Sequence, residues 1–442
     1  MNASPTAPPL RVERIRVTRR NLSLSVTGTR IPTDRRHCTG VSLPLNGVER
    51  AVHCRPSGSW GSAMPVRPFA PHATVDPYPG HRRLLRRSSP YHEPDLDAWV
   101  VTRHSDILDI LRNPRVFLSS GKTGVDDPSR IIILVNDDPP RHTERRALVQ
   151  RPMTRRLNDD LDTWIERRVD QLLDAVDPGN VEAMGDFAVG LPVSVITHLL
   201  GIPDEDSHRF MRMRSPQRGQ TQQEREAEFT AIVGYLRRLV AERRRDPRDD
   251  LISEVLAHDR HGPSLQEWEI IGLCITLLVA GNETTSNLIA NSLNVLAADP
   301  DLWRRLRDQR ELVPVFIEEM VRWQSPTQTI FRTTTEATEI GGTRLPAGSV
   351  VALGVGAANR DPRVFDHADV MDLERDVRDH LGFGSGAHYC IGAPFSRLET
   401  EKLLGAMLDR YDRIEPGERK AQRQNASPFL YGFRHLPLVF RG

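Results

Sequence analysis

The sequence predicts a mainly α-helical protein with small β-sheets. A long apolar segment at 264–299 is typical of a buried helix that crosses a large domain. A short strand pattern at 98–103 leads into an amphipathic helix at 105–113, and further strand patterns lie at 330–353 and 426–440. With 442 residues, of which 38% are hydrophobic, the chain can bury a large core.

Residues 1–63 differ from the rest of the chain. They are rich in Arg, Ser, Thr and Pro, contain three acidic residues and show no sustained apolar period. A transit peptide is one interpretation. A disordered extension, or a start codon assigned too early at a chain that begins at Met64, is simpler. No Gly- or Pro-rich linker follows, so we expect one domain at 64–442.

Composition excludes several classes of protein. The net charge is +1, and no basic-aromatic surface pattern indicates nucleic-acid binding. Four scattered cysteines are too few for a disulfide framework. No apolar run approaches the roughly 20 residues of a membrane span. We therefore expect a soluble, cytoplasmic protein that does not bind membranes.

The long apolar segment has clear helix boundaries. Ser264 and Glu267 match a capping box at its start, and Asp299-Pro300 ends it. A helix of this length, roughly 50 Å, would cross the molecule. Glu283, Thr284 and Thr285 lie within it, although a carboxylate and two β-branched alcohols suit a buried helix poorly. Either Thr284 bonds back to the helix and Glu283 pairs with an arginine, or these side chains serve chemistry.

The most informative segment is Phe-Gly-Ser-Gly-Ala-His-Tyr-Cys-Ile-Gly at 383–392. Its glycines permit a tight backbone beside a planar ligand. Cys390 precedes a helix that starts near Pro394, where free N–H groups favour a thiolate. A lone thiolate in this position suits an axial ligand of haem iron. A buried inert cysteine, a zinc site and a Cys/His nucleophile pair are alternatives, but zinc needs three or four close ligands, and a nucleophile leaves the glycines unexplained.

This pattern resembles the haem-binding loop of the cytochrome P-450 superfamily of haem-thiolate monooxygenases, soluble bacterial type. The resemblance covers about residues 76–440 and implies an α-rich triangular prism with small β-sheets. It implies haem b with Cys390 as the axial ligand of the iron. It also places Phe383, His388 and Gly392 in contact with the haem.

The segment 280–285 resembles the oxygen-activation motif of the same family. By that resemblance Gly281 clears space over the haem, Thr284 steadies dioxygen and Glu283 relays protons from solvent. Two protons are needed to break the O–O bond in a largely dry pocket.

Two further resemblances concern the scaffold. Glu319 and Arg322 can pair on one helix face, which alone indicates a solvated surface pair, but their place resembles the buried Glu-x-x-Arg helix of the family. Val370 stands where some members have a third partner, an arginine, and Arg375 is a possible substitute. By the same resemblance, His142, Arg146, Arg332 and His388 bind the haem propionates.

The resemblance implies that one atom of O2 enters a small, largely apolar organic substrate. NAD(P)H would supply electrons through a ferredoxin or flavodoxin with its reductase. Arginines at 141, 145, 151, 155 and 156 form either a docking surface for this partner or a solvated face. We expect a monomer. A peroxide-driven peroxygenase and a non-catalytic haem-binding sensor or accessory protein are the alternatives, and Glu283 with Thr284 argues against both.

Three segments are expected to line the substrate pocket: 131–134, 326–331 and 429–431. They are mostly apolar, with Thr327, Gln328 and Thr329 interspersed. Such a pocket suits a compact apolar molecule held by one or two polar contacts. The run at 325–335 resembles the branch of the family that oxidises small aromatic acids, and a terpenoid or polyketide substrate remains open.

Overall fold

The computed structural model describes residues 42–45, 48–51, 75–87, 90–121, 132–157, 161–211, 221–259, 265–424 and 427–442. Contacts between Cα atoms divide the chain into two units, Met1–Pro65 and Val66–Gly442. The described part of the first unit is an antiparallel hairpin of β1 (Ser42–Leu45) and β2 (Val48–Ala51). Most of residues 1–63 lies outside the described residues, so their interpretation as an extension stays a prediction.

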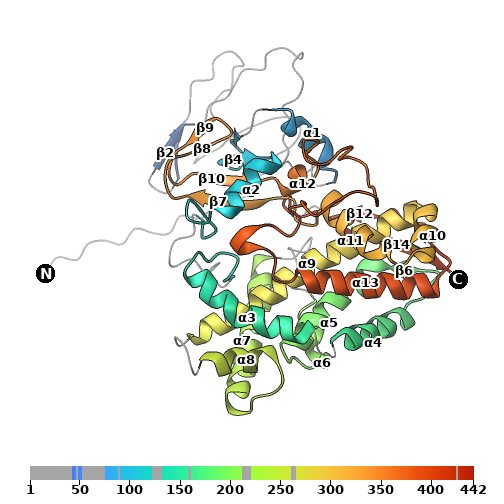
Figure 1. The fold of residues 1–442 in the computed structure, drawn as a ribbon. Coiled ribbons are helices and arrows are strands. Elements are labelled where there is room, and N and C mark those ends of the chain that lie inside the picture. Colours follow the sequence, from blue (N-terminus) through green and yellow to red (C-terminus); the bar gives the residue numbers. More distant parts are fainter. Residues whose placement is uncertain are drawn as a thin grey trace, which may run out of the picture. The chain divides into compact units, whose positions relative to one another are not determined.

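The second unit is mainly helical, as predicted (Figure 1). Its longer helices are α1 (Tyr78–Leu85), α2 (His104–Arg112), α3 (Arg141–Leu157), α4 (Leu161–Asp174), α5 (Gly190–Leu199), α7 (Gln222–Arg245), α8 (Leu251–Asp259), α9 (Glu267–Ala298), α10 (Pro300–Asp308), α11 (Leu312–Trp323) and α13 (Ala393–Arg410). Shorter pieces are α6 (Asp204–Ser207), α12 (Val355–Ala358), a π-helical turn (Met184–Ala188) and a 3-10 turn (Gly386–His388). Within the described residues, no helix is both long and apolar enough to cross a membrane.

The predicted strand segments all contribute to small sheets. The largest has the order β3 (Tyr91–Glu93), β4 (Ala98–Val101), β10 (Val350–Leu353), β7 (Ile330–Thr334) and β5 (Phe117–Leu118). In it β4 and β10 are parallel, and the other neighbours are antiparallel. A second sheet has the order β11 (Arg413–Pro416), β14 (Pro437–Arg441) and β6 (Val181–Glu182). The remaining pairs are β8 (Thr338–Ile340) with β9 (Thr343–Leu345), and β12 (Gln422–Arg423) with β13 (Phe433–His435).

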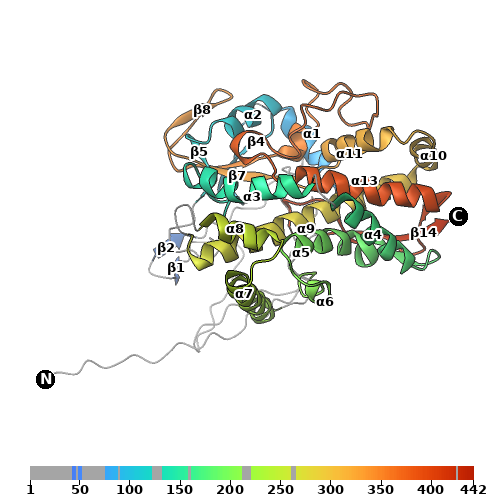
Figure 2. The same ribbon diagram turned by 60° about the horizontal axis from the view of Figure 1, so that its bottom comes forward.

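Helix α9 lies among the other helices of the second unit (Figures 1 and 2). It contacts α5, α7, α8, α10, α11 and α13, and residues 269–278 are all buried, as the apolar sequence predicts. Its predicted end at Asp299 is confirmed. The predicted start is wrong by two residues: Ser264 lies outside the described residues, and the Gln266 backbone N–H donates to the Glu269 carboxylate (2.8 Å). Glu267 instead pairs with Arg237 of α7.

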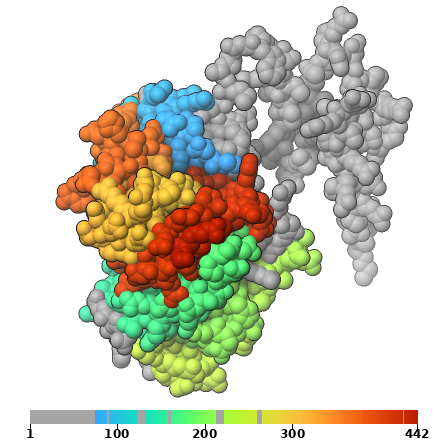
Figure 3. Space-filling view, turned by 90° about the vertical axis from the view of Figure 1, so that its right-hand side faces the viewer, coloured from blue at the N-terminus to red at the C-terminus, as the bar shows by residue number. Residues whose placement is uncertain are grey.

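Helix α13 anchors the cysteine loop to the core. In Figure 3 it forms a red band between α10 and α11 in gold and α4 in green. It also contacts α5 and α9, and its Leu403, Leu404 and Met407 are completely buried. The segment just before α13 is therefore held at the surface of a large, well-packed core.

The predicted pair on α11 is buried. Glu319 and Arg322 have exposed fractions of 0%, and two parallel hydrogen bonds of 2.6 and 2.7 Å join them. Arg322 also donates to the backbone carbonyls of residues 359, 368 and 370. The interpretation as a solvated surface pair is therefore wrong, and the pair holds the segment before the cysteine loop.

The third partner of this pair is Arg375. Its Nε lies 3.5 Å from the Glu319 Oε1, and its side chain is almost completely buried. The Asp372 backbone N–H donates to the same oxygen (2.9 Å). Val370 contributes only its carbonyl oxygen.

We predict that Glu319→Gln lowers the free energy of unfolding by about 3 kcal/mol, because it leaves the Arg322 charge buried and uncompensated. Denaturant unfolding would measure this. Asp301→Asn is the matched control, because Asp301 and Arg304 have the same i,i+3 spacing but are exposed. Its effect should stay below about 1 kcal/mol. Equal losses in the two variants would contradict a structural role for the buried pair.

Candidate active site

Two glycines determine the shape of the loop before α13. Gly384 and Gly386 have φ angles of +72° and +69°, which residues with a Cβ rarely adopt. A Cβ on Gly386 would also lie 2.5 Å from the carbonyl oxygen of Leu111 in α2. The Cys390 backbone N–H donates to the Phe383 carbonyl (2.9 Å) and closes the loop. The predicted tight backbone is therefore present.

The left-handed φ angle that explains the glycines at 384 and 386 does not occur at position 392. Gly392 has a φ of −85°, which any residue can adopt. A Cβ at this position would lie 3.9 Å from the Cys390 sulfur, an ordinary contact. Gly392 immediately precedes α13, and what it contributes is an unobstructed surface beside the sulfur.

The Cys390 sulfur lies beside the first turn of α13. Burial raises the pKa of its thiol, whereas the backbone N–H groups of Gly392 and Ala393 and the charges of Arg146 and Arg397 lower it. The N–H groups at the helix start thus favour the thiolate, as expected, but burial has the larger effect and keeps the pKa above its usual value. A thiol in such surroundings becomes a thiolate when a metal cation replaces its proton.

Four cationic or imidazole side chains from three segments lie together, as the sequence predicts. The ring centroids of His142 and His388 are 3.9 Å apart. Burial lowers the pKa of His388 to about 3, with further contributions from His142, Arg332 and Arg146. Burial also lowers the pKa of Arg332 to about 10 and the pKa of His142. Arg146 of α3 acts on both His142 and the Cys390 sulfur.

The surroundings of these four side chains fit a haem. Among the described residues none of the four forms an ion pair; Arg146 donates to Gln150, Arg332 to the Phe331 carbonyl, and His388 bonds Ser119. Asp138 acts on Arg332, but its oxygens accept backbone N–H groups of Ser119 and Ser120. Arg332 is 8% exposed, and a charged side chain buried to this extent needs an anion. The propionates of a haem would supply it, and the charge of Arg146 in the same group also acts on the Cys390 sulfur.

A short part of α9 is open in the middle of an otherwise buried helix. Val279 is 37% exposed, Ala280 is exposed and Gly281 is partly exposed, between buried residues on both sides. A Cβ on Gly281 would meet nothing within 4 Å. The open space predicted at Gly281 is therefore present, although its place relative to a haem stays a prediction.

The two polar residues of the same segment are partly exposed. Thr284 donates its hydroxyl to the Ala280 carbonyl (2.8 Å). This is the bond back to the helix that the first of the two interpretations expects. Glu283 is also partly exposed, so the expectation of a buried carboxylate is wrong. The hydroxyl oxygen of Thr284 keeps its lone pairs, and both side chains remain candidates for proton transfer.

The expected substrate pocket is more apolar than the sequence suggests. Ile131 lies outside the described residues. Gln328 and Thr329 are buried, and the Gln328 amide donates to the Ser325 carbonyl and the Tyr78 hydroxyl. Phe331 and Phe429 are partly exposed and pack edge to face, 5.0 Å apart. Of the interspersed polar residues, only Thr327 keeps a partly exposed side chain.

Most arginines of the predicted docking surface have carboxylate partners. Arg145 is buried between Asp137 and Glu269. Arg141 also pairs with Glu269 (2.6 Å). The remaining pairs join α3 to the α8 region: Arg155 with Glu254, and Arg156 with Glu254 and Asp249. The positive charge available to a partner protein is therefore smaller than the sequence suggests.

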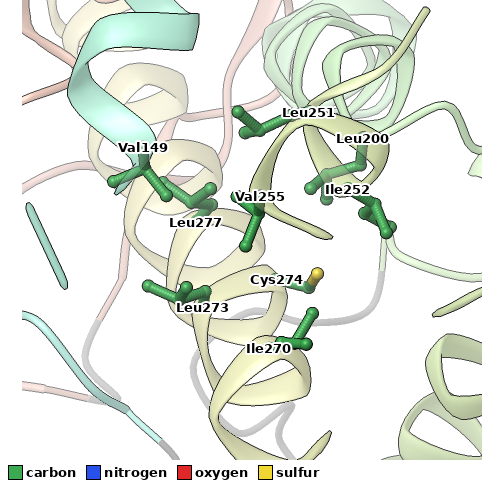
Figure 4. A pocket seen from close by; sticks show the side chains of 9 residues that line it. All are labelled: Val149, Leu200, Leu251, Ile252, Val255, Ile270, Leu273, Cys274 and Leu277. Carbon is green, nitrogen blue, oxygen red and sulfur yellow. The ribbon is translucent and has the colours of Figure 1, made fainter. Parts of the chain in front are cut away.

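The second cysteine of the described residues has no such neighbours. Cys274 of α9 lines a small apolar cavity with eight aliphatic side chains from α3, α8, α9 and the end of α5 (Figure 4). Burial raises the pKa of its thiol to about 12. Cys274 is thus an inert core residue, in contrast to Cys390.

The sequence analysis missed part of the site. Ser119 bonds His388, and nothing in its sequence context signals this contact. Glu318, His380 and Arg397 form a connected group behind the cysteine loop. A signal for Glu318 existed: two consecutive acidic residues, 318 and 319, interrupt an apolar helix, and both need partners.

Comparisons with known proteins match most of the chain. Residues 193–433 match the family model described as Cytochrome P450. Cytochrome P450 109 of Bacillus spizizenii is 35% identical over 375 residues, which are 82% of this chain and 91% of that protein. Nocardicin C N-oxygenase of Nocardia uniformis is 36% identical over 386 residues, 83% of this chain and 94% of that protein.

Solved structures are similar over the same length. CYP109E1 of Bacillus megaterium in complex with corticosterone matches with a TM-score of 0.76 and 30% identity, over 83% of this chain and 99% of that chain. CYP109Q5 of Chondromyces apiculatus matches with a TM-score of 0.77 and 33% identity, over 84% and 97%.

Proposed function

The chain belongs to the cytochrome P450 family of haem-thiolate monooxygenases, and on this premise we propose that it inserts one atom of O2 into a small, largely apolar organic substrate. The second oxygen atom leaves as water. The observation that supports this most is the partly exposed Cys390 near four side chains that can bind two carboxylates.

In this proposal the residues of the loop and of the cationic group bind the haem. Cys390 would bind the iron through its sulfur, and Phe383 and Gly392 would contact the haem beside it. Arg332, Arg146, His142 and His388 donate to the propionates. The haem, when bound, supplies the iron centre at which O2 is activated. Gly281 leaves the opposite side open because it adds no side chain there.

Thr284 and Glu283 would deliver the protons. The Thr284 hydroxyl donates to the Ala280 carbonyl, so its oxygen is held in a fixed position where it can accept a hydrogen bond from water, and that water would carry protons from Glu283. Glu283 is partly exposed and can exchange protons with solvent. A peroxygenase has no need for such an acid–alcohol pair, because peroxide already carries both protons and both electrons.

Two electrons would come from NAD(P)H through a ferredoxin or flavodoxin with its reductase. The part of the chain that the structure describes belongs to one haem-binding family, and its loops contain no flavin or iron–sulfur motif. Arg141 and Arg155 keep more than half of their side chains exposed, although each has a carboxylate partner. An acidic partner would therefore meet moderate positive charge on this face.

For the substrate we propose an uncharged apolar molecule in preference to an aromatic acid. The Gln328 amide, which could have bound a carboxylate, is occupied by Ser325 and Tyr78. Phe331 and Phe429 offer apolar surface instead. The similar protein CYP109E1 was solved with corticosterone and with testosterone, which are molecules of this kind.

The function is tested first by its sulfur ligand. We predict that Cys390→Ala removes the red-shifted carbon monoxide band of the reduced protein and all oxygenase activity. Cys274→Ala is the control and should keep both, because Cys274 lies in an apolar cavity. A Cys390→Ala protein that retains the thiolate-type band would show that the ligand assignment is wrong.

We predict that Thr284→Ala keeps haem and substrate binding but diverts most NAD(P)H oxidation to hydrogen peroxide, because the proton donor at this position is lost. Product and peroxide formed per NAD(P)H would be measured. Ser286→Ala is the matched control, since Ser286 bonds the carbonyl four residues earlier in the same helix but is completely buried. Unchanged coupling in Thr284→Ala would contradict the relay.

We predict that steroids or terpenoids shift the ferric protein from low to high spin and that substituted benzoates do not. The reason is that, among the described residues 326–331, the Gln328 amide is already bonded and only the Thr327 hydroxyl is partly exposed, which does not offset the charge of a carboxylate. Spectral titration of the three classes and of macrolide precursors measures the shift. A response to benzoates alone would overturn the preference for an uncharged substrate.

A further inference from the structure

Glu318 of α11 faces away from the buried pair that its neighbour Glu319 forms. One of its oxygens accepts the Nε–H of Arg397, and the other lies 3.0 Å from the second guanidinium nitrogen of the same arginine. That second oxygen also lies 2.9 Å from the His380 Nε2. The carboxylate thus bonds two side chains, His380 and Arg397, that are separated in the sequence by the cysteine loop.

These two side chains stand at opposite ends of the cysteine loop. His380 precedes the loop, and its Nδ1 accepts the backbone N–H of Gly382 (3.1 Å). Its Nε2 therefore carries the proton that is donated to Glu318. Arg397 lies after the loop, in the second turn of α13. One carboxylate on α11 consequently connects the backbone just before the loop with the helix just after it.

The loop also packs tightly against α11 at its entry. A Cβ on Gly382 would lie 2.4 Å from a methyl carbon of Val321 and 2.8 Å from its carbonyl oxygen. At this separation a small displacement of the loop produces a clash or breaks the bond to His380. The bonds of Glu318 therefore act where the loop has little freedom to shift.

Arg397 connects this carboxylate to the ligand itself. Its guanidinium carbon lies 4.4 Å from the ring centroid of Phe383, the first residue of the loop. Its charge also acts on the Cys390 sulfur and lowers the pKa of that thiol. Glu318 is the carboxylate that offsets this charge, because Arg397 and His380 hold its pKa at about 2 in spite of burial.

We propose that Glu318 is a positioning residue that closes the cysteine loop at both ends and sets the charge of Arg397 beside the sulfur. It thereby influences two properties of the protein with haem bound: the rate at which the thiolate ligand is lost, and the reduction potential of the haem. This inference rests on the proposed function, because it assumes that Cys390 binds haem iron.

The first test is the sign of the change in the haem reduction potential. Glu318→Gln removes a negative charge near the sulfur and should raise the potential. Arg397→Gln removes a positive charge and should lower it. Glu374→Gln, at an exposed carboxylate paired with Arg305, is the control and should leave it unchanged. A purely structural loosening would shift the first two variants in the same direction, which would overturn the charge-setting role.

The second test measures retention of the thiolate. The amide in Glu318→Gln presents one acceptor and one donor, so it can bond either His380 or Arg397 well, but not both. The red-shifted carbon monoxide band should therefore disappear about tenfold faster in mild denaturant than in the parent, as loss of a charge-assisted hydrogen bond implies. A rate equal to that of Glu374→Gln would overturn the closing role.

The outcomes separate this inference from the function on which it rests. A parent protein without the thiolate-type band would refute the proposed function. A parent with the band, whose potential and band lifetime are unaffected by Glu318→Gln, would refute only the role of Glu318. If Glu318→Gln does not fold, Arg397→Gln decides: an unchanged or raised potential overturns the proposal, and a lowered one supports it.

Discussion

The buried ion pair of Glu319 and Arg322 is the interaction on which the site depends. A completely buried charge pair is stable only when its remaining donors and acceptors are also satisfied. Arg322 meets this requirement with backbone carbonyls at 359, 368 and 370, and Glu319 with the Asp372 N–H. The need to satisfy one pair therefore fixes the path of the segment that leads to the cysteine loop.

Both consecutive acidic residues of helix α11 fix the position of the cysteine loop. Glu319 holds the irregular segment before the loop, and Glu318 bonds side chains on either side of the loop itself. Helix α13, which carries Arg397, is in turn fixed by completely buried leucines. The loop thus joins two rigid helices, although its own backbone lies in irregular and left-handed conformations.

The elements with strong local signals were predictable from the sequence. The apolar period of α9, the strands near 98–103 and 330–353, and the glycines at 384 and 386 each reflect a local constraint, and the structure has all of them. Contacts between residues that are far apart in the sequence were harder to predict. The partners of Arg145, Gln328 and His388 come from distant segments, and residue type alone cannot distinguish a paired arginine from an exposed one. The first turn of α9 was misplaced because both Glu267 and Glu269 are suitable capping residues, and tertiary pairing decided between them.

The group of two arginines and two histidines at His142, Arg146, Arg332 and His388 has a consequence for the stability of the protein in a cell. Folding brings these side chains together and removes water from them before any anion is bound, which opposes folding of the chain alone. A ligand with two carboxylates that binds only the folded state recovers this energy and shifts the equilibrium towards that state. Newly made chains that wait for haem would then unfold locally around α3 and the cysteine loop more often than loaded ones, and proteases would remove them first. The lifetime of the chain would in this way depend on the supply of haem.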